Sequence, residues 1–298
     1  MIAAGIDLGG TKIEAQVFDA DWRVTDRRRV DTPRDYDGLV VAMADLIAWT
    51  GAAGAPIGIA AAGLVNPRTG LTYAANLPVT DRAFPADIAA AAGRAVHYVN
   101  DCRAFTLSEA VFGAGRGRDP VVGLILGTGV GAGVTVDGRL LEGASRTGGE
   151  FGHTPAPAHL VVARDLPIVR CGCGRMGCIE TFIAGPGLTR IAARIMGRDL
   201  TPPQIVTARA TDPAAREVWG IWTALVAELL LTVTLMIDPD CVILGGGLST
   251  VPGVADDIAA TLAHAQLSGF ATPDILIADG GETSGARGAA YAAHLAHG

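Results

Sequence analysis

Lysine is almost absent from this chain of 298 residues: Lys12 is the single lysine, and every other basic residue is an arginine. Schiff-base and lysine-nucleophile chemistry is therefore excluded everywhere except at Lys12. The 23 basic and 30 acidic residues give a net charge of −7, and no basic cluster with interleaved aromatics occurs. We expect no nucleic-acid partner, because such proteins carry a basic footprint. Arg27-Arg28-Arg29 is interpreted as a solvated strand or turn edge.

Long hydrophobic runs and a recognisable leader are missing as well. The longest apolar run, from Ala224 to Ile237, contains Glu228 and is shorter than the about 20 residues that a spanning helix needs. Asp7 interrupts the apolar start, and no basic segment precedes it as it would in a signal peptide. Half of the chain is apolar, which is enough for a sizeable core. We expect a soluble, cytoplasmic protein with no membrane partner.

Two familiar nucleotide-binding patterns are absent, but two other glycine-rich turns are present. No G-x-x-x-x-G-K-[ST] occurs, and neither turn opens a helix, which excludes a P-loop and the dinucleotide fingerprint. Each turn lies between two predicted strands, and glycine there lets the backbone N–H groups approach an anion. One such hairpin alone is usually only a tight turn, whereas two in matching positions favour phosphate binding. A third glycine cluster, Gly245–Gly247, follows a later strand.

The order of predicted elements indicates an internal duplication. Each half opens with a strand, a glycine-rich turn and a second strand, and then alternates helices with strands. The sequence therefore predicts two α/β lobes with a cleft between them. We place the small lobe at residues 1–116 and the large lobe at 117–285, and expect the terminal helix, 286–298, to pack back on the small lobe. The predicted strands are 2–6, 13–18, 57–62, 96–99, 121–126, 134–136, 241–244 and 275–277, and the predicted helices lie near 38–49, 88–92, 104–112, 180–195, 213–237, 254–265 and from 286.

A cysteine-rich segment and an upstream histidine form a candidate metal site. Cys171, Cys173 and Cys178 fall within eight residues, and His153 lies in the preceding segment Gly148-Gly-Glu-Phe-Gly-His153. One imidazole and three thiolates satisfy the tetrahedral preference of Zn²⁺ and leave no open position, so the zinc would be structural rather than hydrolytic. Core thiols or an oxidised pair are the alternatives. Glu150 and Glu180 lie beside these ligands and suggest a polar ligand next to the metal.

Together these motifs resemble the ROK family of sugar kinases and its relatives, over residues 2–288. The resemblance rests on Asp7-Leu-Gly-Gly-Thr-Lys12, Asn100-Asp101, Gly127-Thr-Gly-Val-Gly-Ala-Gly133, Glu150-Phe-Gly-His153 and the cysteine segment that ends at Glu180. Within the family, Tyr73–Pro78, Leu124–Val130 and Asp165–Cys171 are most similar to N-acetylglucosamine kinases. The resemblance implies a two-lobed, actin-like and hexokinase-like (ribonuclease H-like) duplicated α/β fold, and a homodimer.

The resemblance also implies ATP-dependent phosphorylation of N-acetyl-D-glucosamine at its 6-hydroxyl. Asp101 is expected to be the general base, as a carboxylate of ordinary pKa near 4 that is ionised at pH 7. Asp7 is expected to hold Mg²⁺ or its waters. Sugar contacts are expected from Gly63, Asn76, Asn100, Asp101, Glu150, His153 and Glu180. Nucleotide contacts are expected from Gly5, Asp7, Gly9, Gly10, Thr11, Lys12, Gly127, Thr128, Gly129, Val130, Gly131, Ala132, Gly133, Gly246 and Gly247.

Alternative functions remain open from the sequence. The sugar could instead be glucose, N-acetylmannosamine or fructose. Without the motifs around it, Asp101 would be a helix N-cap and Glu180 a helix-start carboxylate that the helix dipole favours. A non-catalytic sugar sensor and a zinc hydrolase are further hypotheses. The implied small-molecule partners are an amino sugar and ATP with Mg²⁺, and the implied structural metal is Zn²⁺ held by His153, Cys171, Cys173 and Cys178.

Overall fold

The computed structural model describes residues 1–51, 54–74 and 76–297, and these form two compact units. The first unit contains residues 1–117, 133–149 and 279–298, and the second contains 118–132 and 150–278. The chain passes from one unit to the other within a strand, since residues 130–132 and 133–136 belong to different units. The predicted lobes, 1–116 and 117–285, differ from these units mainly at 133–149 and 279–285.

The first unit is built on a five-stranded sheet with the order β3-β2-β1-β4-β7. Strands β1 and β2 form the predicted hairpin, β3 extends it antiparallel, and β4 and β7 continue parallel to β1. A small two-stranded sheet follows β4. The strands of the main sheet are β1 (Ala3–Leu8), β2 (Lys12–Phe18), β3 (Val24–Asp31), β4 (Ile57–Ala61) and β7 (His97–Asn100), and those of the small sheet are β5 (Leu64–Val65) and β6 (Thr72–Tyr73).

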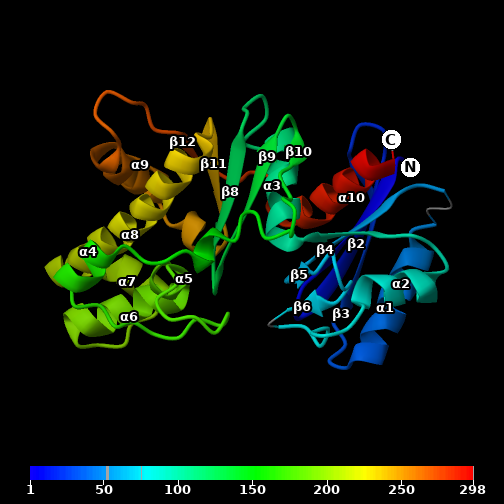
Figure 1. The fold of residues 1–298 in the computed structure, drawn as a ribbon, viewed down its shortest axis with the longest axis horizontal. Helices are drawn as coiled ribbons and strands as arrows, with labels where there is room; N and C mark the ends of the chain where they lie inside the picture. The colour runs from blue at the N-terminus through cyan, green and yellow to red at the C-terminus, as the bar shows by residue number, and fades with distance from the viewer. Residues whose placement is uncertain (52–53, 75, 298) are drawn as a thin grey trace. The chain divides into compact units, whose positions relative to one another are not determined.

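The main sheet of the first unit is covered by helices on both faces, towards which the side chains of β1 point alternately. Ala4, Ile6 and Leu8 face a core that helices α1 and α2 complete. The other face of β1 carries small residues and lies against α10, which also packs on α3 (Figure 1). The helices of this unit are α1 (Tyr36–Trp49), α2 (Phe84–Ala92), α3 (Asp101–Phe112) and α10 (Ser284–His297).

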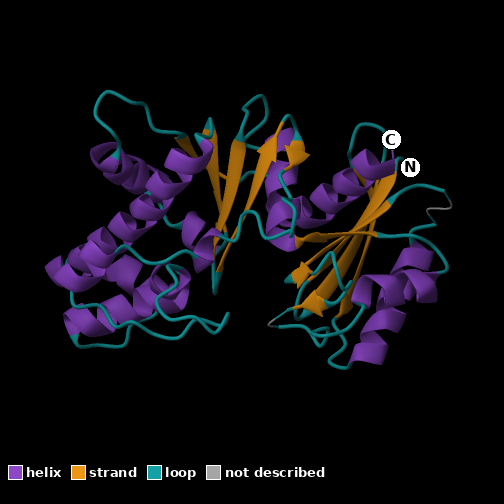
Figure 2. Ribbon diagram, viewed as in Figure 1, coloured by secondary structure: helices purple, strands orange, loops and turns teal. Residues whose placement is uncertain are grey.

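The sheet of the second half repeats the strand order of the first. Its order is β10-β9-β8-β11-β12, so a hairpin again precedes two parallel additions. The repeated pairing agrees with the duplication predicted from the sequence. Helices and strands of both units are distinguished by colour in Figure 2. The strands are β8 (Val121–Leu126), β9 (Val130–Val136), β10 (Arg139–Leu140), β11 (Cys241–Gly245) and β12 (Asp274–Ile277).

The long helix α8 forms the core of the second unit. It is long and apolar enough to cross a membrane, but many of its apolar side chains, including Trp222 and Leu225, are buried inside the second unit. The predicted single helix 180–195 is interrupted, because Ala184 is extended and Gly185-Pro186 begins a new helix. The helices are α4 (Ala158–Ala163), α5 (Glu180–Ile183), α6 (Gly185–Met196), α7 (Pro202–Ala208), α8 (Pro213–Ile237) and α9 (Val254–Ala265), with short 3₁₀ turns at Phe151–His153, Gly247–Thr250 and Gly281–Thr283.

Candidate active site

Asn100 and Asp101 lie where β7 ends and α3 begins. The Asn100 side chain is the N-cap of α3: its oxygen accepts the N–H groups of Cys102 at 3.0 Å and Arg103 at 3.3 Å. Its amide donates to the Gly63 carbonyl at 3.1 Å. Gly63 has φ +95°, and a Cβ there would lie 2.2 Å from the Tyr73 carbonyl oxygen, so only glycine fits. The predicted Gly63, Asn100 and Asp101 are thus brought together.

The expectation of an ordinary pKa for Asp101 is wrong. Burial raises the pKa of this carboxyl, although the N–H of Cys102, at 2.9 Å, opposes the rise. Asp101 is also the first helical residue rather than the N-cap, because Asn100 occupies the cap position. A buried carboxylate with a raised pKa is a stronger base than an exposed one, which suits a proton acceptor.

The first glycine-rich turn forms a small polar pocket in the first unit. Asp7, Gly9 and Lys12 line a cavity of about 130 Å³ together with Glu14 and Arg29. Burial raises the pKa of Asp7 to about 6, and the charges of Asp101 and Glu14 act in the same direction. A buried carboxylate beside a small pocket fits the oxygen donors that Mg²⁺ prefers. Gly10 lies beside Asn76, since a Cβ at Gly10 would be 3.5 Å from the Asn76 carbonyl oxygen.

The second glycine-rich turn lines a larger pocket in the second unit. Gly127 and Thr128 border a cavity of about 750 Å³, and Gly247 borders it from the end of β11. That volume lies within the range of small-molecule and cofactor sites. The structure thus brings together two glycine clusters that are about 120 residues apart. The other lining residues are Gly185, Pro186, Thr189, Pro202, Pro203, Val206, Thr207, Leu248, Thr250, Val251 and Pro252.

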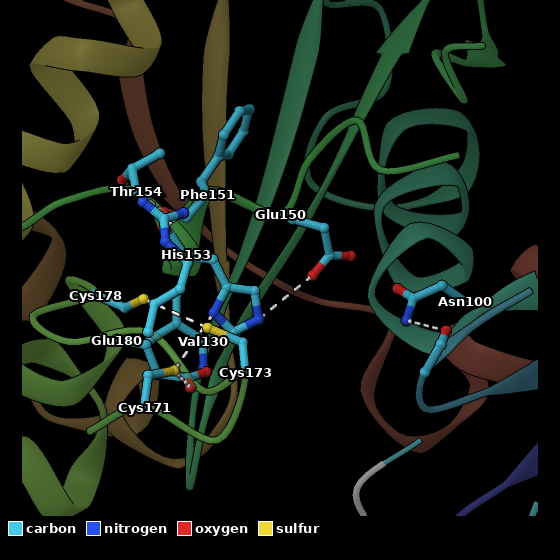
Figure 3. Close-up of polar contacts among 12 residues, drawn as sticks. Asn100, Val130, Glu150, Phe151, His153, Thr154, Cys171, Cys173, Cys178 and Glu180 are labelled. Atoms are coloured by element: carbon cyan, nitrogen blue, oxygen red, sulfur yellow. Dashed lines mark hydrogen bonds and ion pairs between the residues drawn. The ribbon is translucent and has the colours of Figure 1, made fainter. Parts of the chain in front are cut away.

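Glu180 connects the second glycine-rich turn to the cysteine cluster. One carboxylate oxygen accepts the Val130 N–H at 2.8 Å, and the other lies 3.4 Å from the Cys171 sulfur (Figure 3). A Cβ at Gly129 would approach the first oxygen to 3.0 Å, so glycine is needed for the contact. Glu180 is therefore held by the turn and lies next to a candidate metal ligand.

His153, Cys171, Cys173 and Cys178 converge as the sequence predicts. One ligand atom from each lies within 4.8 Å of all the others, and Figure 3 shows the four side chains pointing at one another. The Cys173 and Cys178 sulfurs are 3.6 Å apart, and the Cys171 sulfur is 3.5 Å from His153 Nδ1. Zn–S bonds of 2.3 Å in a tetrahedron place sulfurs about 3.8 Å apart, so the donor set fits Zn²⁺.

Backbone hydrogen bonds join the segment that follows His153 to the cysteine segment. Ile179 N–H donates to the Thr154 carbonyl at 2.8 Å, and Ala156 N–H donates to the Gly177 carbonyl at 3.0 Å. His153 turns Nδ1 towards Cys171, while Nε2 lies 3.9 Å from a Glu150 carboxylate oxygen (Figure 3). One ring nitrogen can therefore bind a metal while the other faces a carboxylate that is expected to contact the sugar.

Some predicted nucleotide residues have packing reasons for their identity. A Cβ at Gly5 would lie 1.9 Å from the Ala286 carbonyl oxygen, so glycine there permits the close approach of α10. Gly133 packs in the same way on Thr106 of α3. Strand β9 already begins at Val130, so Gly131, Ala132 and Gly133 are strand residues and the turn itself is Gly127–Gly129. Gly246 has φ +83° and lies against the Leu126 backbone. The backbone carbonyl of Thr11 accepts the N–H of Thr32, which follows β3.

Sequence reasoning missed Arg29 and Glu14 beside Asp7. Arg29 donates from Nε to Glu14 at 2.6 Å, and Gln16 donates to the other oxygen of Glu14 at 2.6 Å. The predicted solvated strand edge at Arg27-Arg28-Arg29 is confirmed, since all three residues are exposed on β3, and Arg29 bonds to Glu14 from there. The available signal was the alternation of β2, which points Glu14 and Gln16 to the same face.

Comparison with known proteins identifies the family. The profile described as "ROK family" matches residues 3–296, which is nearly the whole chain. This chain belongs to the ROK family. The family assignment made from the motifs is therefore confirmed.

Curated relatives of this ROK protein match over almost their full length. An N-acetylgalactosamine kinase of Shewanella sp. (strain ANA-3) is 39% identical over 97% of this chain and 96% of its own. An N-acetyl-D-glucosamine kinase of Escherichia coli O6:H1 is 37% identical over 96% of this chain and 97% of its own.

Solved structures of ROK proteins have the same fold as this chain. A ROK hexokinase from Thermus thermophilus superposes with a TM-score of 0.88 at 32% identity, covering 100% of this chain and 99% of its own. A ROK family glucokinase from Streptomyces griseus, in complex with glucose and AMPPNP, gives a TM-score of 0.77 at 28% identity, covering 99% of this chain and all of its own. The predicted two-lobed, actin-like α/β fold is confirmed.

Proposed function

We propose that this ROK protein is an ATP-dependent kinase that phosphorylates the 6-hydroxyl of N-acetyl-D-glucosamine. The observation that carries the proposal is the Asn100–Asp101 pair, in which a buried carboxylate follows a side chain held by both the helix start and Gly63. Two of its curated relatives, named as an N-acetylgalactosamine kinase and an N-acetyl-D-glucosamine kinase, support a sugar kinase.

The chemistry requires a proton acceptor for the sugar hydroxyl. Asp101 takes the proton as the hydroxyl oxygen bonds to the γ-phosphorus and the bond between that phosphorus and the β–γ bridging oxygen breaks, releasing ADP. Phosphoryl transfer depends mainly on positioning and charge neutralisation. At the sugar hydroxyl oxygen the protein therefore needs to supply only an oriented base. Asn100 orients the sugar beside Asp101.

The carboxylates near the cysteine cluster recognise the sugar. Glu150 and Glu180 accept hydrogen bonds from hydroxyls, and His153 uses its Nε2 edge for the same ligand. These three side chains are half-buried, and a site that hydrogen-bonds the hydroxyls of its substrate discriminates against analogues that leave its polar groups unpaired. Glu180 is already fixed by the Val130 N–H, so its remaining lone pairs have a defined direction.

Nucleotide binding uses both glycine-rich turns. The pocket bordered by Gly127, Thr128 and Gly247 takes the nucleoside part, and its apolar lining suits a base and ribose. Asp7 would hold the magnesium ion of Mg-ATP or its waters, which would supply charge neutralisation for the transferred phosphoryl group. Lys12 and the N–H groups of its turn approach the phosphates.

Zinc acts as a structural metal in this proposal. The cluster would supply the four ligands that a structural Zn²⁺ takes, which would leave none of its positions for a substrate or a nucleophilic water. By holding the ion, these residues would tie the segment of Cys171–Cys178 to His153 and so keep Glu150 and Glu180 beside it.

N-acetylgalactosamine is a second candidate substrate. The observation that favours it is the 39% identity to the Shewanella enzyme, which exceeds the 37% identity to the E. coli enzyme. These two sugars differ in the orientation of one hydroxyl, at carbon 4. A site that reads hydroxyls with fixed carboxylates is expected to separate them by a large factor.

A sugar panel tests the proposal. We expect kcat/KM for N-acetylglucosamine to exceed that for N-acetylgalactosamine, N-acetylmannosamine, glucose and fructose by about 10²-fold or more, measured by ADP release with saturating Mg-ATP. A higher kcat/KM for N-acetylgalactosamine than for N-acetylglucosamine would leave the proposed sugar kinase activity in place and would change the proposed substrate. A preference for glucose would contradict an N-acetylhexosamine kinase, and no turnover of any sugar would contradict a kinase.

A further inference from the structure

Helix α10 lies on one face of the first sheet with almost no side chain between the backbones. Strand alternation points Ala3, Gly5 and Asp7 to this face. A Cβ at Gly5 would lie 1.9 Å from the Ala286 carbonyl oxygen, and one at Gly58 would lie 1.8 Å from that of Ala289. Such close packing leaves no compressible layer, so a shift of α10 is transmitted to β1.

The first turn of α10 rests against Asp7. A Cβ at Gly285 would lie 2.7 Å from one carboxylate oxygen of Asp7 and 3.1 Å from the other. Asp7 is the last β1 residue on this face, and it lines the small polar pocket of the first hairpin. The position of the Asp7 carboxylate is therefore limited on one side by the start of α10.

A single buried carboxylate, Glu109 of α3, holds that start in place. One oxygen accepts the Gly280 N–H at 3.0 Å and the Ser284 hydroxyl at 2.6 Å. The other accepts the N–H groups of Asp279 at 3.1 Å and Ala114 at 3.3 Å. Glu109 is fully buried, and three of these four donors come from a segment about 170 residues away in the chain. Charge-assisted bonds of this kind are the stronger class of hydrogen bond.

Helix α3 also carries Asp101 in its first turn. Asp101 and Glu109 are eight residues apart, which is about 12 Å along a helix axis. Between them, Ala104 contacts α10 so closely that a Cβ at Gly288 would lie 1.8 Å from the Ala104 carbonyl oxygen. Helices α3 and α10 therefore form one closely packed pair. In this pair α3 carries the proposed base, Asp101, and the first turn of α10 contacts the proposed magnesium ligand, Asp7.

We propose that Glu109 is a positioning residue for phosphoryl transfer: by fixing the first turn of α10 it sets the Asp7 carboxylate relative to Asp101. The inference rests on the proposed function, in which Asp7 binds the magnesium of Mg-ATP and Asp101 is the base. It assigns a role to a residue that lies outside the glycine-rich turns, the sugar-reading carboxylates and the cysteine cluster.

Glu109→Gln and Ser284→Ala weaken the contact between Glu109 and the start of α10 to different degrees. In Glu109→Gln the amide group faces two donors whichever way it is turned, because each carboxylate oxygen now accepts two hydrogen bonds. Ser284→Ala removes one donor and leaves the backbone bonds of Gly280 and Asp279 in place. The matched control is Tyr291→Leu, which disturbs the middle of α10, where Tyr291 packs on Trp22 and Phe112.

The measurement is calorimetric binding of AMPPNP to the full chain with sugar present, once with Mg²⁺ and once with a chelator. We expect Glu109→Gln to reduce the Mg²⁺-dependent gain in affinity by about tenfold and Ser284→Ala by a smaller factor. Binding of the metal-free nucleotide and of the sugar should stay within about twofold of wild type. Tyr291→Leu should lower the melting temperature without changing the Mg²⁺-dependent gain.

Either of two results would overturn the inference. The first is a Glu109→Gln protein that melts earlier but keeps the full Mg²⁺-dependent gain, since Glu109 would then only stabilise the fold. The second is an equal loss of that gain in Tyr291→Leu. Because the readout is binding, a wild type that binds Mg-AMPPNP but turns over no sugar contradicts the proposed function and still tests Glu109. A wild type with no Mg²⁺-dependent binding overturns both.

Discussion

Asp101→Asn will lower the turnover number by about 10²- to 10⁴-fold, the range that a positioned general base contributes. Asparagine keeps the size of the side chain and an oxygen that can accept the Cys102 N–H, but it cannot take a proton at neutral pH. Sugar binding should change little, so the loss will fall on kcat rather than on KM. Steady-state kinetics with the preferred sugar of the panel provide the measurement.

The stability of the same variant is its internal control. Burial raises the pKa of Asp101 in the folded state, so this carboxyl favours folding below its unfolded value near 4. That contribution is lost as the pH rises through the folded-state pKa. Asp101→Asn should therefore melt at or above the wild-type temperature at pH 7.5, and the difference should shrink towards pH 4. A variant that retains most of its turnover would remove Asp101 from the role of base.

Loss of zinc will unfold the second unit before it affects any chemical step. We expect about one zinc per chain by elemental analysis, and expect Cys178→Ser to lose it with a fall in melting temperature of about 10 °C or more. The physical reason is that metal binding is part of the folding free energy where ligands come from separate segments. Kinase activity should fall in proportion to the folded fraction.

Cys241→Ser is the matched control for the zinc experiment. Cys241 is a buried cysteine of β11 in the same unit, and it lies outside the four-ligand cluster. Its substitution also places a hydroxyl in the core, but it should leave the zinc content unchanged. A purified wild-type protein that contains no zinc and melts as a single stable species would contradict a structural metal. A Cys178→Ser protein that stays stably folded but loses its catalytic activity would favour the zinc hydrolase alternative.

Much of the local structure could be predicted from the residues alone. The hairpins around Asp7–Lys12 and Gly127–Gly133 follow from glycine between apolar runs, and helix α8 follows from its length and apolar spacing. The short helices α4 and α7 were missed because six or seven residues carry too little periodicity. The exposed strand β3, rich in arginine, has no apolar alternation to indicate it.

The candidate site also combines features that the residues predict with features that depend on the folded surroundings. Ligand spacing in the cysteine segment predicted that three cysteines and His153 converge, since donor types and chain separation are properties of the sequence. The pKa of Asp101, by contrast, depends on the atoms that exclude water around it. Sequence reasoning assigned it an ordinary value because burial is invisible in a local motif.

The repeated order of elements, the glycine-rich turns and the chemical groups that could bind phosphate, sugar and zinc can all be read from the residues. Which glycines are needed for packing became clear from the folded chain, as Gly5 against Ala286 demonstrates. Folding also joined Glu109 to a helix that starts about 170 residues later. The physical reason is that backbone conformation responds to neighbouring residues, whereas burial and hydrogen-bond partners depend on segments that meet only after folding.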